Sequence, residues 1–121
     1  MDQGIVNAEL QALQDALRAF AREREWEQFH SPKNLASALS VEAAELLEHF
    51  QWMTEEQSHT LGEDKKNEIA EEVADVFLYL LQLSDKLGID PLEAARRKLE
   101  INAAKYPVDL AKGSSKKYSD F

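Results

Sequence analysis

Two stretches of this sequence carry pairs of carboxylates at helical spacing. Glu42 and Glu45 are three residues apart, and Glu72 and Asp75 have the same separation. Residues at positions i and i+3 lie on one face of a helix, with Cβ atoms about 5–6 Å apart. If the two helices pack together, four carboxylates surround one point, where they stay ionised only if cations neutralise them. Mg²⁺ prefers oxygen ligands, so the pattern predicts a Mg²⁺ site, in which Mn²⁺ could substitute.

Both pairs lie in strongly apolar surroundings, which include Leu46, Leu47 and Phe50 near the first pair and Val76 and Phe77 near the second. The alternative is that the acids are solvated on the outer faces of amphipathic helices. A helix that is apolar around most of its circumference has little solvent-facing surface, so we expect its acids to line an interior cleft. The same excess of apolar surface predicts burial between subunits of a homo-oligomer, a dimer or tetramer.

Helical periodicity and capping residues predict an all-α chain, a four-helix bundle completed by homo-oligomerisation. The main helices are expected over residues 7–24, 32–52, 64–87 and 91–106. Ser31-Pro32 and Asp90-Pro91 are typical helix starts, and Gly88 is a typical residue after a helix end. A capping-box pattern at Thr54 predicts a short helical turn between the second and third helices.

Composition narrows the class of protein. The chain has 121 residues, a net charge of −9 and no cysteine. This length predicts one domain over residues 1–121, of which 108–121 form a polar, extended C-terminal tail. The negative charge argues against binding to a nucleic acid polymer, and the lack of cysteine excludes disulfides and thiolate zinc sites. No apolar run approaches the about 20 residues that span a bilayer, and no signal-peptide pattern is present, so we expect a cytoplasmic protein without membrane contact.

Aromatic residues stand at both ends of the second expected helix. Trp26 precedes this helix and Trp52 lies at its end. Each could be core packing, or the two could grip a planar base from neighbouring subunits. Stacking accepts any base, so a choice among bases needs hydrogen bonds, for which Gln28 and His30 are candidates in the loop after Trp26.

Two further sets of residues could contact a substrate. Tyr79 follows Asp75 by four residues on the same helical face, so its hydroxyl could bind a substrate or simply lie at the edge of the core. Lys98, Asn102 and Lys105 share a face of the last helix. Lysine binds phosphate as a point charge, although cations near a helix C-terminus also suit the helix dipole.

In their order along the chain, these residues resemble the all-α nucleoside triphosphate pyrophosphohydrolases of the MazG-like superfamily, most closely its dCTP pyrophosphatases. The resemblance extends from about Ala19 to Tyr118. It is carried by Arg24-Glu25-Trp26-Glu27-Gln28-Phe29-His30, Asn34-Leu35, Glu42, Glu45, Phe50-Gln51-Trp52, Glu71-Glu72-Val73-Ala74-Asp75-Val76, Tyr79-Leu80, Asn102, Lys105-Tyr106-Pro107-Val108 and Gly113-Ser114-Ser115-Lys116-Lys117-Tyr118.

The resemblance implies a function and a set of site residues. It implies Mg²⁺-dependent hydrolysis of a deoxynucleoside triphosphate, dCTP or a modified dCTP, to the monophosphate and pyrophosphate, in a homo-oligomer with sites shared between subunits. The catalytic and metal-binding positions would be Glu42, Glu45, Glu72 and Asp75. The positions that contact the nucleotide would be Trp26, His30, Trp52, Tyr79, Asn102 and Tyr106.

Two positions depart from the pattern of these proteins. The superfamily motif often begins with paired glutamates, whereas Val41 precedes Glu42 here. Leu17 stands where close relatives have a histidine that contacts the nucleotide. A leucine cannot donate a hydrogen bond, so this departure bears on base or sugar preference.

Two other functions remain open from the residues alone. The first is a non-enzymatic helical interaction module with solvated carboxylates, whose melting temperature Mg²⁺ would leave unchanged. The second is a di-iron protein, because Glu27/His30 and Glu56/His59 have the Glu-x-x-His spacing of such sites. Both of these pairs lie in poorly periodic segments, outside the long helices, so we interpret their spacing as accidental.

Overall fold

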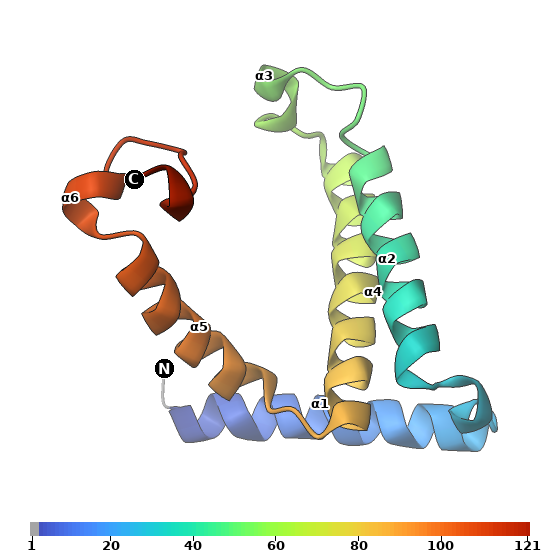
Figure 1. The fold of residues 1–121 in the computed structure, drawn as a ribbon. Coiled ribbons are helices and arrows are strands. Elements are labelled where there is room, and N and C mark those ends of the chain that lie inside the picture. Colours follow the sequence, from blue (N-terminus) through green and yellow to red (C-terminus); the bar gives the residue numbers. More distant parts are fainter. Residues whose placement is uncertain (1–2) are drawn as a thin grey trace. The chain divides into compact units, whose positions relative to one another are not determined.

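The computed structural model describes residues 3–121, shown in Figure 1. The chain divides into two compact units, Met1–Gly88 and Ile89–Phe121. Every regular element in the described range is helical, and no strand occurs there, which confirms the all-α class. No helix among these residues is long and apolar enough to cross a membrane.

Three long helices build the first unit. They are α1 (Gln3–Glu23), α2 (Pro32–Glu48) and α4 (Glu63–Leu87). The 3₁₀ helix η1 (Glu27–Phe29) precedes α2, and the short helix α3 (Glu55–Ser58) precedes α4. Figure 1 shows α2 and α4 side by side, with α1 crossing near the C-terminal end of α4.

Local sequence signals explain where these helices begin and end. The Ser31 hydroxyl accepts a hydrogen bond from the Asn34 amide at 3.1 Å, which caps α2 as predicted. The capping box at Thr54 is also present at the start of α3. Gly88 ends α4 with a φ of 68°, a left-handed conformation that favours glycine.

The second helix is shorter than predicted. It ends at Glu48 rather than near Trp52. The amide of Phe50 donates to the Leu47 carbonyl, and the amide of Met53 to the Phe50 carbonyl, both at 2.9 Å. These bonds reach back three residues instead of four, so the chain tightens into turns that lead to α3.

The buried core of the first unit is small. Its buried side chains are Ala21, Leu35, Ile69, Leu81 and Ser84. Many large apolar side chains of α2 and α4 are exposed in the single chain, including Val41, Leu47, Val73, Phe77 and Leu80. This exposure agrees with the predicted burial of both helices between subunits, which stays a prediction.

The second unit contains α5 (Pro91–Lys105), α6 (Val108–Ala111) and the 3₁₀ helix η2 (Tyr118–Asp120). The Asp90 carboxylate caps α5 by accepting hydrogen bonds from the amides of Leu92 and Glu93. The prediction of an extended tail is wrong, because Tyr118 and Phe121 fold back to pack edge-on against Tyr106, with ring centroids 6.1 and 6.0 Å away. Aromatic contacts of this kind hold an otherwise polar segment in place.

Candidate metal centre and nucleotide pocket

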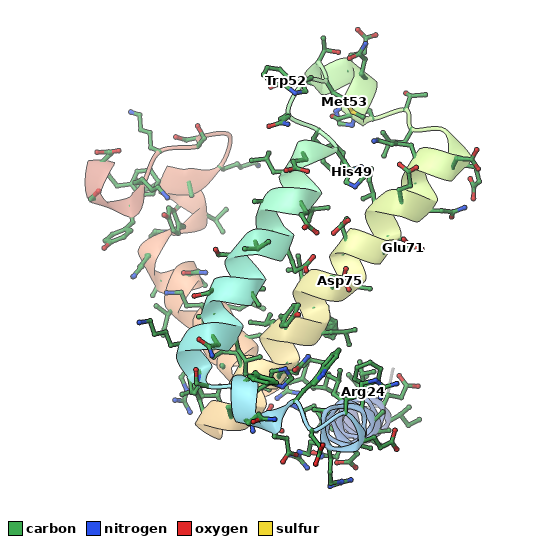
Figure 2. The ribbon with its side chains drawn as sticks, turned by 90° about the vertical axis from the view of Figure 1, so that its right-hand side faces the viewer. Arg24, His49, Trp52, Met53, Glu71 and Asp75 are labelled. Atoms are coloured by element: carbon green, nitrogen blue, oxygen red, sulfur yellow. The ribbon has the colours of Figure 1, made fainter. Side chains whose placement is uncertain are left out.

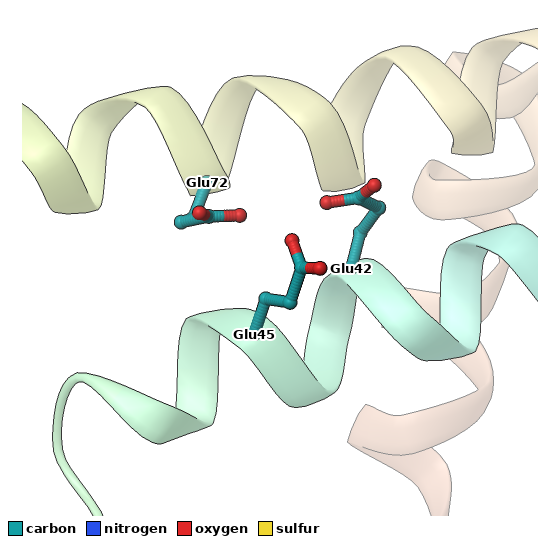
Figure 3. Close-up of side chains that lie close together, drawn as sticks. All are labelled: Glu42, Glu45 and Glu72. Atoms are coloured by element: carbon teal, nitrogen blue, oxygen red, sulfur yellow. The ribbon is translucent and has the colours of Figure 1, made fainter.

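Three carboxylates from two helices meet between α2 and α4. Figure 3 shows Glu42 and Glu45 of α2 and Glu72 of α4 pointing toward one another. One carboxylate oxygen from each residue lies within 4.8 Å of the others, and all three side chains are half-buried. Asp75 lies one turn further along α4 (Figure 2) and is more exposed. The structure therefore brings together three of the four predicted ligands, with the fourth at their edge.

The crowding of negative charge changes the ionisation of this cluster. The pKa of Glu42 is raised to about 7, first by burial, then by the hydrogen bond and charge of Glu45, and by the charges of Asp75 and Glu72. The pKa of Glu72 is also raised, again first by burial and then by Glu45 and Asp75, while His49 opposes the shift. Without a cation, the cluster therefore does not ionise fully at neutral pH.

Two oxygens of the cluster lack any partner. Oε2 of Glu42 and Oε2 of Glu72 are shielded from solvent and make no hydrogen bond within residues 3–121. A buried oxygen without a partner carries the full cost of its lost hydration. A divalent cation would satisfy both atoms, and an all-carboxylate set of oxygens suits Mg²⁺ or Mn²⁺. The residues therefore fit the predicted metal.

A cavity of about 350 Å³ is lined mostly by residues of α1 and α4. Asp75 lines this cavity and also acts electrostatically on Glu42 and Glu72. The volume of the cavity lies at the lower end of the range for small-molecule sites, about 300–1,000 Å³. The cavity is therefore large enough for a small ligand whose charged end could reach the carboxylates.

Three of the predicted substrate-binding residues line this cavity, namely Trp26, His30 and Tyr79. The Trp26 ring packs edge-on against Phe20, at a centroid distance of 5.7 Å, and against His30 at 6.5 Å. These contacts fix an aromatic surface at the cavity wall. Leu17, which departs from the pattern of close relatives, lines the same cavity.

Two predicted residues of the first unit lie outside the cavity wall. Gln28 donates its side-chain amide to the Glu25 carbonyl at 2.9 Å, and Glu25 has a φ of 54°. Gln28 therefore stabilises a turn in a strained conformation. Trp52 is 89% exposed and lies near α3 (Figure 2). Trp52 therefore does not line the 350 Å³ cavity, and its contact with a nucleotide stays a prediction.

The remaining predicted residues belong to the second unit. Asn102 and Tyr106 are half-buried there, at the C-terminal end of α5. The Lys105 ammonium lies over the Tyr118 ring, 4.6 Å from its centroid. A cation–π contact of this kind is weak at an exposed site, so it would not prevent Lys105 from binding phosphate. Their roles in nucleotide binding stay predictions.

Gln82 is a cavity residue that the sequence motifs do not reveal. It lines the cavity together with Tyr79, which precedes it by three residues on α4. Glutamine is common on solvated helix faces, so its type alone carries no signal for a site. The only available indication was its position on the helical face that bears Asp75 and Tyr79.

Comparison with known proteins places this geometry in a family. Residues 37–121, which include all four carboxylates, match the MazG-like family. The chain belongs to the MazG-like family. Similarity to solved structures agrees, because a crystal structure of a pyrophosphatase from Archaeoglobus fulgidus superposes with a TM-score of 0.78 at 47% identity, over 82% of this chain and 93% of that one.

Curated relatives extend the similarity of this MazG-like chain. It is 43% identical to dCTP pyrophosphatase 1 of Homo sapiens and 42% identical to dCTP pyrophosphatase 1 of Mus musculus, each over 103 residues. The match covers 84% of the chain and 61% of either relative. The chain thus spans about three-fifths of the length of the curated relatives that it matches.

Proposed function

We propose that this chain hydrolyses a deoxynucleoside triphosphate, dCTP or a modified dCTP, to the monophosphate and pyrophosphate with Mg²⁺ as cofactor. Its similarity to proteins named dCTP pyrophosphatase supports both the substrate and the reaction. Its similarity to a solved pyrophosphatase supports the reaction independently.

One observation carries the proposal. Asp75 belongs both to the wall of the aromatic cavity and to the electrostatic environment of the carboxylate cluster. A nucleotide whose base lies in the cavity would therefore have its phosphates near Glu42, Glu45 and Glu72. Four acids repel phosphates unless cations intervene, so this arrangement suits a substrate that arrives with metal ions.

Each group has a defined task in this proposal. Glu42, Glu45, Glu72 and Asp75 would hold Mg²⁺, which neutralises phosphate charge and lowers the pKa of water. Trp26 would stack on the base, while His30 and Tyr79 would offer polar groups to the base or sugar. Glu42, Glu45 and Glu72 are half-buried, which would limit water around phosphates bound there and strengthen the electrostatic interactions of those phosphates.

The proposal includes assembly into a dimer or tetramer. Covering the exposed apolar side chains of α2 and α4 with a second copy would remove them from water. In such an assembly Trp52, Asn102, Lys105 and Tyr106 could complete a site on a neighbouring subunit.

The decisive experiment is a screen of nucleoside triphosphates with Mg²⁺ that separates pyrophosphate from orthophosphate as the product. We expect pyrophosphate and the monophosphate in equal amounts, with dCTP or a modified dCTP as the best substrate. Release of orthophosphate would contradict the reaction. Absence of any hydrolysis, with a melting temperature that does not respond to Mg²⁺, would favour a helical interaction module instead.

A further inference from the structure

Gln82 has a side-chain amide without a partner in a cavity wall. The side chain is half-buried, and within residues 3–121 neither its oxygen nor its nitrogen makes a hydrogen bond. It lines both the 350 Å³ cavity and a smaller adjoining cavity of about 40 Å³. The side chain therefore borders both cavities, and no hydrogen bond to a neighbouring residue fixes which way its amide oxygen points.

The position of Gln82 along α4 determines which part of a ligand it meets. Glu72, Asp75, Tyr79 and Gln82 follow one another along this helix. At 1.5 Å per residue, Gln82 lies about 10 Å further along the helix axis than Asp75. This separation is comparable with the distance from the α-phosphate of a nucleotide to the far edge of its base. Phosphates at the carboxylates would thus leave the far edge of the base near Gln82.

In a pyrimidine nucleotide that far edge is the C4 position. The sugar is attached at N1, and C4 lies opposite N1 in the ring. Cytosine carries an amino group at C4, which donates hydrogen bonds, whereas uracil carries an oxygen, which accepts them. A glutamine amide contains both a donor and an acceptor, and rotating it by half a turn exchanges the two.

We propose that Gln82 hydrogen-bonds the C4 substituent of a pyrimidine base and that its unfixed amide accepts either an amino or an oxo group there. This inference rests on the proposed function, because it assumes phosphates at the carboxylates. It assigns to Gln82 the recognition of a polar edge, and it explains how a pocket with Leu17 in its wall can still offer a hydrogen bond to the base.

Two substitutions separate this role from simple packing. Gln82→Leu keeps the approximate volume and removes both hydrogen-bonding groups, so kcat/KM should fall about tenfold for dCTP and for dUTP, with their ratio unchanged. Gln82→Glu at about pH 8 presents an ionised carboxylate, which only accepts hydrogen bonds. This variant should keep the wild-type kcat/KM for dCTP, while its kcat/KM for dUTP should fall about tenfold. The ratio of kcat/KM for dCTP to that for dUTP should therefore rise about tenfold.

Gln14→Leu is the matched control. Gln14 lines the smaller cavity but not the larger one, so this variant should have the wild-type kcat/KM for both dCTP and dUTP. If Gln82→Leu matches the wild type, or if Gln82→Glu leaves the ratio unchanged, Gln82 does not contact C4. An equal loss in Gln14→Leu would show that packing in this region causes the effect, which would also overturn the inference.

Calorimetric titration with dCMP and dUMP distinguishes failure of this inference from failure of the proposed function. If the wild type hydrolyses dCTP while no variant changes the hydrolysis or the binding of either nucleotide, only the inference fails. If the wild type hydrolyses nothing, yet Gln82→Leu weakens binding of both monophosphates about tenfold, the inference stands and the hydrolytic function fails. If neither monophosphate binds the wild type and no triphosphate is hydrolysed, both fail.

Discussion

Arg18 of α1 holds Asp85 of α4 through two hydrogen bonds from one guanidinium group. Nε of Arg18 donates to Oδ2 of Asp85 at 2.8 Å, and Nη2 donates to Oδ1. The hydrogen bond and charge of Arg18 lower the pKa of Asp85 below its ordinary value. This ion pair joins the two helices that form most of the cavity wall, so it connects the stability of the first unit to the shape of its pocket.

Breaking this pair should lower stability by a small amount. Asp85→Asn should reduce the melting temperature at neutral pH, and Asp15→Asn should reduce it less, because Arg18 reaches Asp15 through one longer contact of 3.2 Å. The effect is modest because the Arg18 side chain is 48% exposed. Since the pKa of Asp85 is lowered, its contribution is present above about pH 4 and is lost as the pH falls further. Melting curves of both variants across this range check the prediction.

The metal-free protein should become less stable as the pH rises through neutrality. Glu42 has a folded-state pKa raised to about 7, above the ordinary glutamate value of about 4.3. Its contribution is therefore fully present below about pH 4.3 and is lost as the pH rises through about 7. With chelator present, the melting temperature should fall between pH 5.5 and 8, and Glu42→Gln should flatten this dependence. Glu48→Gln, an exposed glutamate on the same helix, is the control.

Adding Mg²⁺ at about pH 8 should reverse this loss, because a bound cation needs ionised carboxylates. Binding to the folded state alone raises stability in proportion to the logarithm of the Mg²⁺ concentration above the dissociation constant. A melting temperature that ignores millimolar Mg²⁺ would contradict the metal site, whatever the activity of the protein.

Neutral substitutions of the acids should abolish most activity while the fold is kept. Glu42→Gln, Glu45→Gln, Glu72→Gln and Asp75→Asn should each lower kcat at least about 100-fold, because each removes a charged oxygen ligand. Without metal, they should match or exceed the wild type in melting temperature, since each removes a repelling charge. Near wild-type turnover in all four would show that the chemistry lies elsewhere.

Replacing either tryptophan should raise KM, but only the effect at Trp52 should depend on assembly of the subunits. Trp26→Ala should raise KM for every nucleotide by about 5- to 100-fold, because Trp26 lines the cavity and stacking does not choose a base. Trp52→Ala should raise KM only if the site is shared between subunits, because Trp52 is exposed in the single chain. In contrast to the tryptophan variants, His30→Ala should reduce the difference in kcat/KM between dCTP and the other deoxynucleoside triphosphates. Values of kcat/KM for the four deoxynucleoside triphosphates test all three, and unchanged tryptophan variants would indicate packing roles.

The exposed apolar face should make the protein a dimer or tetramer in solution. A charge in a buried interface costs several kcal/mol when it is unpaired, so Leu47→Glu, at a side chain 59% exposed in one chain, should shift the protein toward monomer. Light scattering at micromolar concentration measures this directly. A monomeric wild type would contradict both the assembly and the shared site.

Sequence by itself predicted the four long helices, although not the early end of α2 or the helical turns of the tail, and it predicted the pairing of acids within each helix. Caps such as Ser31 and the left-handed Gly88 act through hydrogen bonds within three or four residues, so they can be recognised locally. The separations of Glu42 from Glu45 and of Glu72 from Asp75 likewise place each pair on one helical face without any knowledge of the fold.

Only the tertiary structure decided which of these residues meet. The packing of α2 on α4 brings Glu42, Glu45 and Glu72 within 4.8 Å and leaves Asp75 between the cluster and the cavity. The packing of α1 against α4 places Gln82 in the cavity wall. Which residues meet depends on how the apolar faces of separate helices pack together. That packing depends on the shapes of many side chains across the whole unit, so no single spacing in the sequence predicts it.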